Sequence, residues 1–91
     1  MSEVTNEEGR HRFELEEEGE TAFITYIVEG ERITLTHTIV PPEIEGRGVG
    51  SRLVRGALDD VRERGLKVVP QCSFVRGYID RHEEYRDLLA A

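Results

Sequence analysis

The 91-residue sequence is poor in the residue types that mark disulfide-bonded and membrane proteins. It has no tryptophan and one cysteine, Cys72, which excludes an intramolecular disulfide and a metal site built from several cysteines. Its apolar runs fall well short of the ~20 residues that a membrane helix needs. The first nine residues are acidic and polar, without the pattern of a secretory signal. These absences predict a cytoplasmic protein that does not bind membranes.

Basic side chains are also scarce. The chain has 12 Lys and Arg against 19 Asp and Glu, and its net charge is −7. Because contact with phosphate backbones needs a basic surface, we expect no binding to nucleic acid. The acidic residues gather in the first twenty positions, as a solvated surface or as one that attracts a cationic amine. We expect residues 1–10 to be a disordered acidic tail and residues 11–91 to form a single domain.

The first half of the chain has the patterns of β-strands. Residues 11–17, 21–28 and 32–40 alternate apolar with polar side chains or are rich in β-branched residues. This predicts three antiparallel strands. In the third, alternation places His37 on one face with Ile33, Leu35 and Ile39.

The second half changes to helical spacing. Apolar residues recur every three to five positions from Val49 to Val61, which predicts a helix that Gly65 ends. A mostly apolar strand, Leu66 to Cys72, follows, and its lack of alternation predicts burial on both faces. Helical spacing then resumes to the C-terminus. The predicted fold class is α/β (α+β): a mostly antiparallel sheet, a β-α-β crossover around a glycine loop, and a C-terminal helix.

Two prolines and three glycines separate the third predicted strand from the first helix. In "IVPPEIEGRGVGSR", residues 39–52, the glycines Gly46, Gly48 and Gly50 occupy every second position. The first N–H groups of a helix lack carbonyl partners, and the helix dipole adds partial positive charge there. Glycines let the backbone close around an anion, but they also serve tight turns. The stretch predicts an anion-binding loop or a turn, and it matches neither the dinucleotide fingerprint nor the P-loop.

The glycine stretch also carries a family resemblance. Residues 45–50, "EGRGVG", resemble motif A of the GNAT superfamily of acetyltransferases, Gln/Arg-x-x-Gly-x-Gly/Ala, with Glu45 in place of Gln or Arg. Together with "GLKVVPQCSFVRGYIDRHEEY", they resemble a compact single-domain branch of that superfamily over roughly residues 12–89. The resemblance implies that acetyl-CoA is the co-substrate and an amine the acceptor. By position, it implies that Ile39 and Val40 lie beside the pantetheine arm and that the pyrophosphate contacts Arg47, Gly48, Val49, Gly50, Ser51 and Arg52.

Four side chains are candidates for the chemistry that the resemblance implies, which needs a base for the ammonium and an acid for the departing thiolate. His37 and Glu43 are candidate bases, although His37 also fits a hydrogen-bonded core histidine and Glu43 a solvated loop position. Cys72 precedes a predicted helix, whose N-terminus favours a thiolate, so it is either reactive or a small buried hydrophobe. Tyr78 is the nearest phenol for the acid.

The leading hypothesis is an acetyl-CoA-dependent N-acetyltransferase, and the alternative is a non-catalytic acyl-CoA-binding or sensing module. A hydrolase that uses Cys72 is disfavoured because no Cys/His/Asx spacing is present. A metal enzyme is disfavoured because the three histidines lack ligand spacing. The acceptor amine and the oligomeric state stay open.

Overall fold

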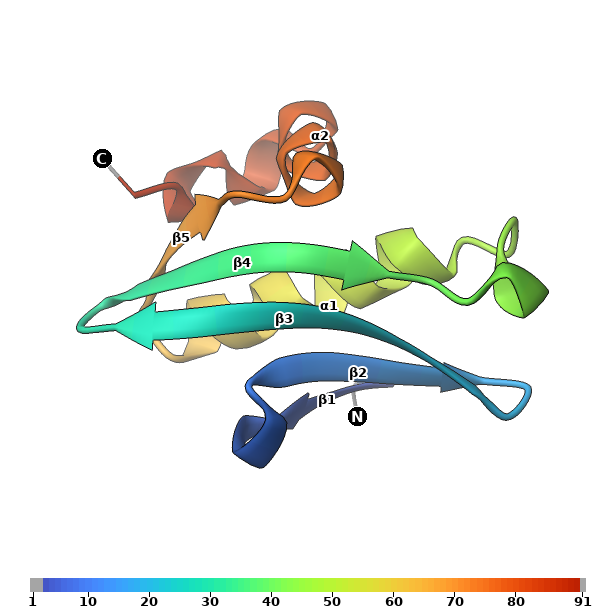
Figure 1. The fold of residues 1–91 in the computed structure, drawn as a ribbon. Coiled ribbons are helices and arrows are strands. Elements are labelled where there is room, and N and C mark those ends of the chain that lie inside the picture. The colour runs from blue at the N-terminus through green and yellow to red at the C-terminus, as the bar shows by residue number, and fades with distance from the viewer. Residues whose placement is uncertain (1–2, 91) are drawn as a thin grey trace.

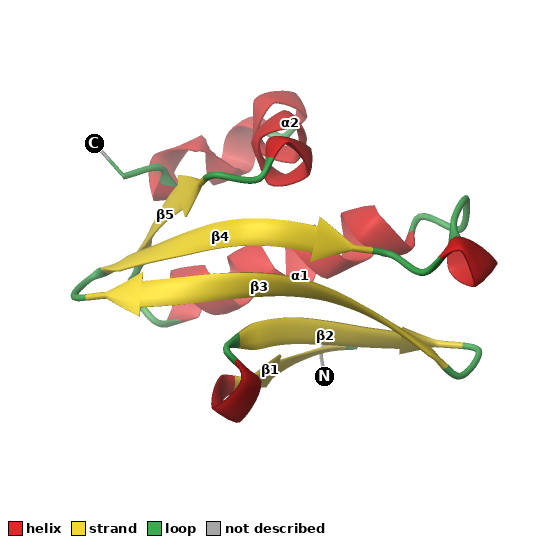
Figure 2. Cartoon of the chain, in the orientation of Figure 1, coloured by secondary structure: helices red, strands yellow, loops and turns green. Residues whose placement is uncertain are grey.

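The computed structural model describes residues 3–90. They contain a five-stranded sheet of order β1-β2-β3-β4-β5 (Figures 1 and 2). The strands are antiparallel from β1 to β4, and β5 is parallel to β4. Helix α1 connects β4 to β5 along the chain. This confirms the predicted fold class, its β-α-β crossover and its C-terminal helix. The elements are β1 (Val4–Glu7), η1 (Glu8–Arg10), β2 (Arg12–Glu17), β3 (Glu20–Glu29), β4 (Arg32–Ile39), η2 (Pro42–Ile44), α1 (Val49–Glu63), β5 (Lys67–Pro70), α2 (Ser73–Arg81) and η3 (Glu83–Leu88), where η marks a 3-10 helix.

One face of the sheet packs against α1 and forms the core (Figure 1). The buried side chains of α1 recur every three or four residues, so a single apolar stripe faces the sheet. Alternate residues of β2, β3 and β4 meet this stripe, because successive strand side chains point to opposite faces. Each large apolar side chain buried here contributes about 1.5–3 kcal/mol. The contributing residues are Leu53, Val54, Ala57, Leu58 and Val61 of α1 with Phe13, Leu15, Ala22, Ile24, Tyr26, Ile33 and Leu35 of the strands.

Helix α1 ends as the sequence predicts. Gly65 has a φ of +70°, a left-handed value that glycine adopts at little cost. Its N–H donates to the Arg62 carbonyl at 3.1 Å, and the N–H of Leu66 donates to the Val61 carbonyl at 3.1 Å. This pair of bonds is the Schellman motif, which satisfies carbonyls at the helix end and directs the chain into β5.

The N-terminal residues are not a disordered tail. Val4–Glu7 form β1, which pairs antiparallel with β2 along its whole length. The Tyr26 hydroxyl donates a 2.6 Å hydrogen bond to Asn6 Oδ1 and links β1 to β3. The prediction of disorder is therefore wrong for residues 4–10, and Met1 and Ser2 lie outside the described residues. Acidic composition misleads here because strands at a sheet edge commonly carry charged side chains.

A β-bulge in β4 reverses the predicted orientation of His37 and Ile39. Residues 25 and 26 of β3 pair with residues 37 and 35 of β4, which leaves Thr36 as an extra residue. Beyond it the alternation shifts by one position, so Leu35 is buried but His37 and Ile39 are exposed. The prediction that these three share one face is wrong, because an inserted residue moves every later side chain to the other face.

β5 lies at the sheet edge and separates from β4 early. Their pairing runs only from Arg32↔Lys67 to Leu35↔Pro70, and Val68 alone is fully buried within β5. The predicted burial on both faces is therefore wrong. Past Pro70, the N–H of Cys72 donates to the Leu35 carbonyl at 3.1 Å, and β4 continues without a strand partner among residues 67–90. We call the opening between the end of β4 and the start of α2 the notch.

Candidate active site

The glycine loop joins β4 to α1 in a conformation that two glycines permit. Gly46 and Gly48 have φ values of +83° and +73°, which residues with a Cβ rarely adopt. Gly48 is the N-cap of α1, and its carbonyl accepts the first helical hydrogen bond from the Arg52 N–H at 3.1 Å. The N–H groups of residues 49–51 therefore lack helical carbonyl partners. They form a row of donors where the helix dipole is positive.

A cavity of about 420 Å³ lies at this end of α1. The glycine loop, Val40 and Ile44 line it together with Phe74 of α2. A Cβ on Gly50 would lie 2.7 Å from Cζ of Phe74. An aromatic ring thus approaches the helix backbone at Gly50, whereas Gly46 and Gly48 are favoured by their backbone angles. We call this the amide cavity.

A second cavity, of about 440 Å³, occupies the notch. Thr36, His37, Thr38 and Ile39 of β4 line one side, and Gln71, Cys72 and Ser73 line the other. Ile39 and Val40 are consecutive, as are Ser73 and Phe74, so neighbouring residues of the same two segments line the notch cavity and the amide cavity. The bulge is what turns His37 away from the core and into this cavity.

Cys72 is the N-cap of α2, and its Sγ lies 3.4 Å from Thr38 Oγ1. Burial raises the pKa of the thiol, but hydrogen bonds from the Thr38 hydroxyl and from the backbone amides of Val75, Phe74 and Thr38 outweigh burial and lower the pKa below its ordinary value. These donors stabilise the thiolate, as the sequence predicts for a cysteine at a helix N-terminus. Cys72 and His37 thus place a thiol and an imidazole in the lining of one cavity.

Comparison with known proteins identifies the family of this chain. A family model described as GCN5-related N-acetyl-transferase matches residues 12–88. The chain belongs to this family. Protein NATD1 of Mus musculus and Protein NATD1 of Gallus gallus are each 34% identical to it over 79 residues, covering 84% of this chain and 72% of theirs. The solution structure of a GCN5-like candidate N-acetyltransferase from Staphylococcus aureus is 30% identical, has a TM-score of 0.72, and covers 100% of this chain and 92% of that one.

Family membership confirms the resemblance. The structure shows which of the residues that the resemblance assigns to acetyl-CoA line the two cavities and which do not. Along the two cavities lie Ile39, Val40, Gly48, Val49, Gly50 and Ser51. Both arginines of the loop are engaged elsewhere. Arg47 pairs with Glu18 in the β2–β3 turn, and Arg52 donates to Glu17 at 2.8 Å and to Glu3 at 3.0 Å. Neither arginine lines the cavities, which leaves the backbone amides as the principal donors of the loop.

Two candidate catalytic residues are not brought to the notch. Tyr78 is 4% exposed on the core side of α2, where its ring stacks on His82 with 3.9 Å between centroids. Burial raises the pKa of its hydroxyl. Glu43 is exposed in η2, and neither residue lines the notch cavity or the amide cavity.

Sequence reasoning missed Thr38 and Phe74. Thr38 has the alternation of an ordinary strand residue, and only the bulge together with the pairing of β4 and β5 brings its hydroxyl to Cys72. Phe74 has the spacing of a core residue in α2, but it is 40% exposed and faces Gly50. The one available signal was its position two residues after Cys72, at the start of a helix that faces the glycine loop.

The described residues also define two absences. Among residues 3–90, no group of three or more His, Cys, Asp or Glu side chains is arranged to hold a metal ion. None of the helices in the same range is long and apolar enough to cross a membrane.

Proposed function

We propose that this protein transfers the acetyl group of acetyl-CoA to an amine. The observation that carries the proposal is that neighbouring residues of the same two segments line the two cavities. The amides at the start of α1 suit a pyrophosphate, and His37 and Cys72 line the notch cavity. A CoA arm along Ile39 and Val40 would join the two cavities. Membership in the GCN5-related family supports acetyl-CoA as the co-substrate.

In the proposed reaction, Cys72 accepts the acetyl group first. Its thiolate attacks the carbonyl carbon of the thioester, the C–S bond of acetyl-CoA breaks, and the CoA sulfur leaves with the electron pair and takes up a proton. The lowered pKa of Cys72 supports this role. The acceptor ammonium then loses a proton to His37, its nitrogen attacks the acetyl-cysteine, and Cys72 leaves as a thiolate. Of the two protons that the ammonium gives up, one balances the CoA thiol and one goes to solvent.

Titration calorimetry and intact-protein mass spectrometry with acetyl-CoA test the proposal. We expect saturable binding and one added acetyl mass on the wild type. Cys72→Ala should keep the binding and lose the added mass. Because Cys72 is the sole cysteine, the adduct has one thiol site, and denatured protein with acetyl-CoA controls for spontaneous acetylation.

The other outcomes separate the alternatives. Binding without the adduct, but with acetylation of an amine from a test panel, would replace the cysteine step by direct attack of the amine on the thioester. Binding without either product would favour the acyl-CoA-sensing module. No binding would contradict acetyl-CoA as the ligand.

A further inference from the structure

The sheet is also left open at the far end of α1 from the notch. β2 begins at Arg12, which pairs with Thr25, whereas β3 runs on to Glu29. The last contact on this side is the N–H of Tyr26, which donates to the His11 carbonyl at 3.0 Å. Figure 1 shows the end of β3 projecting past β2. Among residues 3–90, no strand covers this side of residues 27–29, and we call residues 26–29 the open edge.

Val28 directs its backbone N–H and C=O to the open edge. Alternate residues of an antiparallel strand point these groups to the same side, and Tyr26, two residues earlier, bonds to His11 there. None of residues 3–90 pairs with the backbone of Val28 on that side. A free donor and acceptor at a strand edge are the groups to which an added strand bonds.

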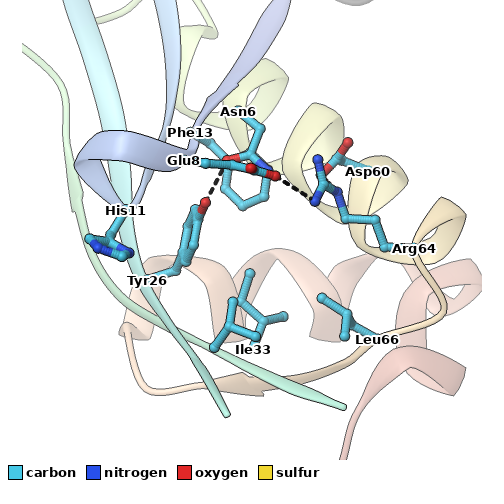
Figure 3. Close-up of a pocket in the computed structure, with 10 residues that line it drawn as sticks. Asn6, Glu8, His11, Phe13, Tyr26, Ile33, Asp60, Arg64 and Leu66 are labelled. Atoms are coloured by element: carbon cyan, nitrogen blue, oxygen red, sulfur yellow. Dashed lines mark hydrogen bonds and ion pairs between the residues drawn. The ribbon is translucent and has the colours of Figure 1, made fainter. Parts of the chain in front are cut away.

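A pocket of about 420 Å³ opens beside the open edge on the face that carries α1 (Figure 3). Its floor is apolar, with Phe13, Tyr26 and Ile33 no more than 6% exposed. A second hollow, lined by His11, Tyr26, Ile27 and Val28, follows the edge itself. One hollow thus lies where a strand would run, and the other where an inward-pointing side chain of that strand would be buried.

The rim of the pocket is acidic. Arg64 donates to Glu8 at 2.9 Å and to Asp60 at 2.8 Å, so one guanidinium serves two carboxylates (Figure 3). Exposed Glu29 ends β3 at the same edge. A second copy of this chain, of net charge −7, would bring the same carboxylates against these, whereas a basic segment complements them.

Apolar exposure at the open edge also indicates a partner. Ile27 is 54% exposed and Val28 48%, and both rank among the large hydrophobic side chains that the structure leaves in solvent. Sheet edges without a partner usually carry charges or proline, because bare apolar edges invite aggregation. Here the apolar residues sit beside an unfilled pocket, which is the pattern of a recognition surface.

We propose that the open edge binds an extended segment of another protein as an added strand. One apolar side chain of that segment fills the pocket, and Lys or Arg residues near it face Glu8 and Asp60. The proposal is independent of acetyl-CoA, because the pocket shares no lining residue with the notch cavity or the amide cavity.

Selection from a phage-displayed library of random octapeptides on the full chain tests this inference. We expect enriched peptides to carry an apolar residue flanked by Lys or Arg. A synthetic copy of the best peptide should shift the amide NMR signals of residues 26–29 and slow hydrogen exchange at Val28. Val28→Pro removes the N–H that faces the open edge and spares the bonds to β4, so we expect affinity to fall about tenfold or more. Leu89→Ala, at an exposed apolar position outside the open edge and its two hollows, is the control and should keep the affinity.

Methylation of the peptide backbone gives a test that needs no protein variant. If Val28→Pro does not fold, a peptide N-methylated at the residue opposite Val28 should lose about tenfold in affinity for the wild type. Failure to enrich any peptide, equal binding to folded Val28→Pro, or NMR shifts confined to the notch would overturn the proposal. So would sedimentation of the free chain as a dimer that Val28→Pro dissociates, because the open edge would then belong to a second copy.

Discussion

Strand pairing stops both at the notch and at the open edge. The two places differ in the backbone conformation of the residues beside them. At the notch, β4 and β5 part after Leu35 and Pro70, and the loop that leads from β4 to α1 and lines the amide cavity contains the left-handed glycines Gly46 and Gly48. At the open edge, β2 simply ends at Arg12, and β3 keeps ordinary strand geometry. The proposed anion site therefore depends on glycines at particular positions, whereas a surface that pairs with a strand needs no special residue type.

The largest effect is expected in the core that both openings share. Leu58 is fully buried in α1, and Leu58→Ala should lower the free energy of unfolding by about 2–5 kcal/mol. Urea denaturation followed by circular dichroism measures the change. Arg55→Ala, at an exposed position of the same helix, should stay within about 0.5 kcal/mol. Unchanged stability of Leu58→Ala, or an equal loss in Arg55→Ala, would contradict the placement of Leu58 in the core.

The elements that the sequence predicts well are those whose signals are local. The stripe of α1 has the helical period, Gly65 ends the helix, and the glycines before α1 have the left-handed angles that their type favours. The position of Cys72 at a helix N-terminus follows from adjacent elements. Each of these inferences needs only residues within one or two turns of chain.

The features that the sequence does not predict depend on pairing between distant segments. The bulge at Thr36 exists because two registers of β3 against β4 meet there, and it alone decides that His37 faces the notch. The strand at Val4–Glu7 is stabilised by β2 and by the bond from Tyr26 to Asn6, despite its acidic composition. The open edge is likewise a difference in length between β2 and β3, for which no residue type is a signal.

The second prediction is that a change in the glycine loop weakens acetyl-CoA binding but not peptide binding at the open edge. Gly48→Val places a branched side chain at a φ of +73°, which costs about 1–2 kcal/mol and displaces the amides of α1. We expect acetyl-CoA affinity, measured by calorimetry, to fall about tenfold or more, with peptide binding at the open edge retained. Gly30→Val is the matched control, because Gly30 has a φ of +61° in the β3–β4 turn, away from the notch. Equal loss of acetyl-CoA in both variants would mean that strain, and not the loop, is responsible.

The third prediction concerns the electrostatics of the notch. The Thr38 hydroxyl lowers the pKa of Cys72, so Thr38→Val should raise it. At a pH below that pKa the thiolate fraction then falls, and alkylation by iodoacetamide slows. The pH midpoint of the alkylation rate should move upward. Thr36→Val alters the same cavity, but the Thr36 hydroxyl bonds to Thr25, so the midpoint should stay in place. A midpoint unchanged in Thr38→Val would assign the lowered pKa to the backbone amides alone.

The smallest effect is expected for a substitution of Arg52. This substitution tests whether backbone amides alone, or also a guanidinium group, would contact the pyrophosphate. Arg52 lies in the first turn of α1, but its guanidinium faces Glu17 and Glu3, and the hydrogen bond to Glu17 holds the pKa of Arg52 above its ordinary value. We therefore expect Arg52→Ala to leave acetyl-CoA affinity unchanged in calorimetry at low and high salt. If Arg52 instead left its carboxylates for the pyrophosphate, the variant would lose affinity, and the loss would shrink with added salt because screening weakens the charge contact. That result would mean that the Arg52 side chain, as well as the backbone amides at the start of α1, binds the pyrophosphate. The glycine loop would then differ from the open edge in its side chains as much as in its backbone.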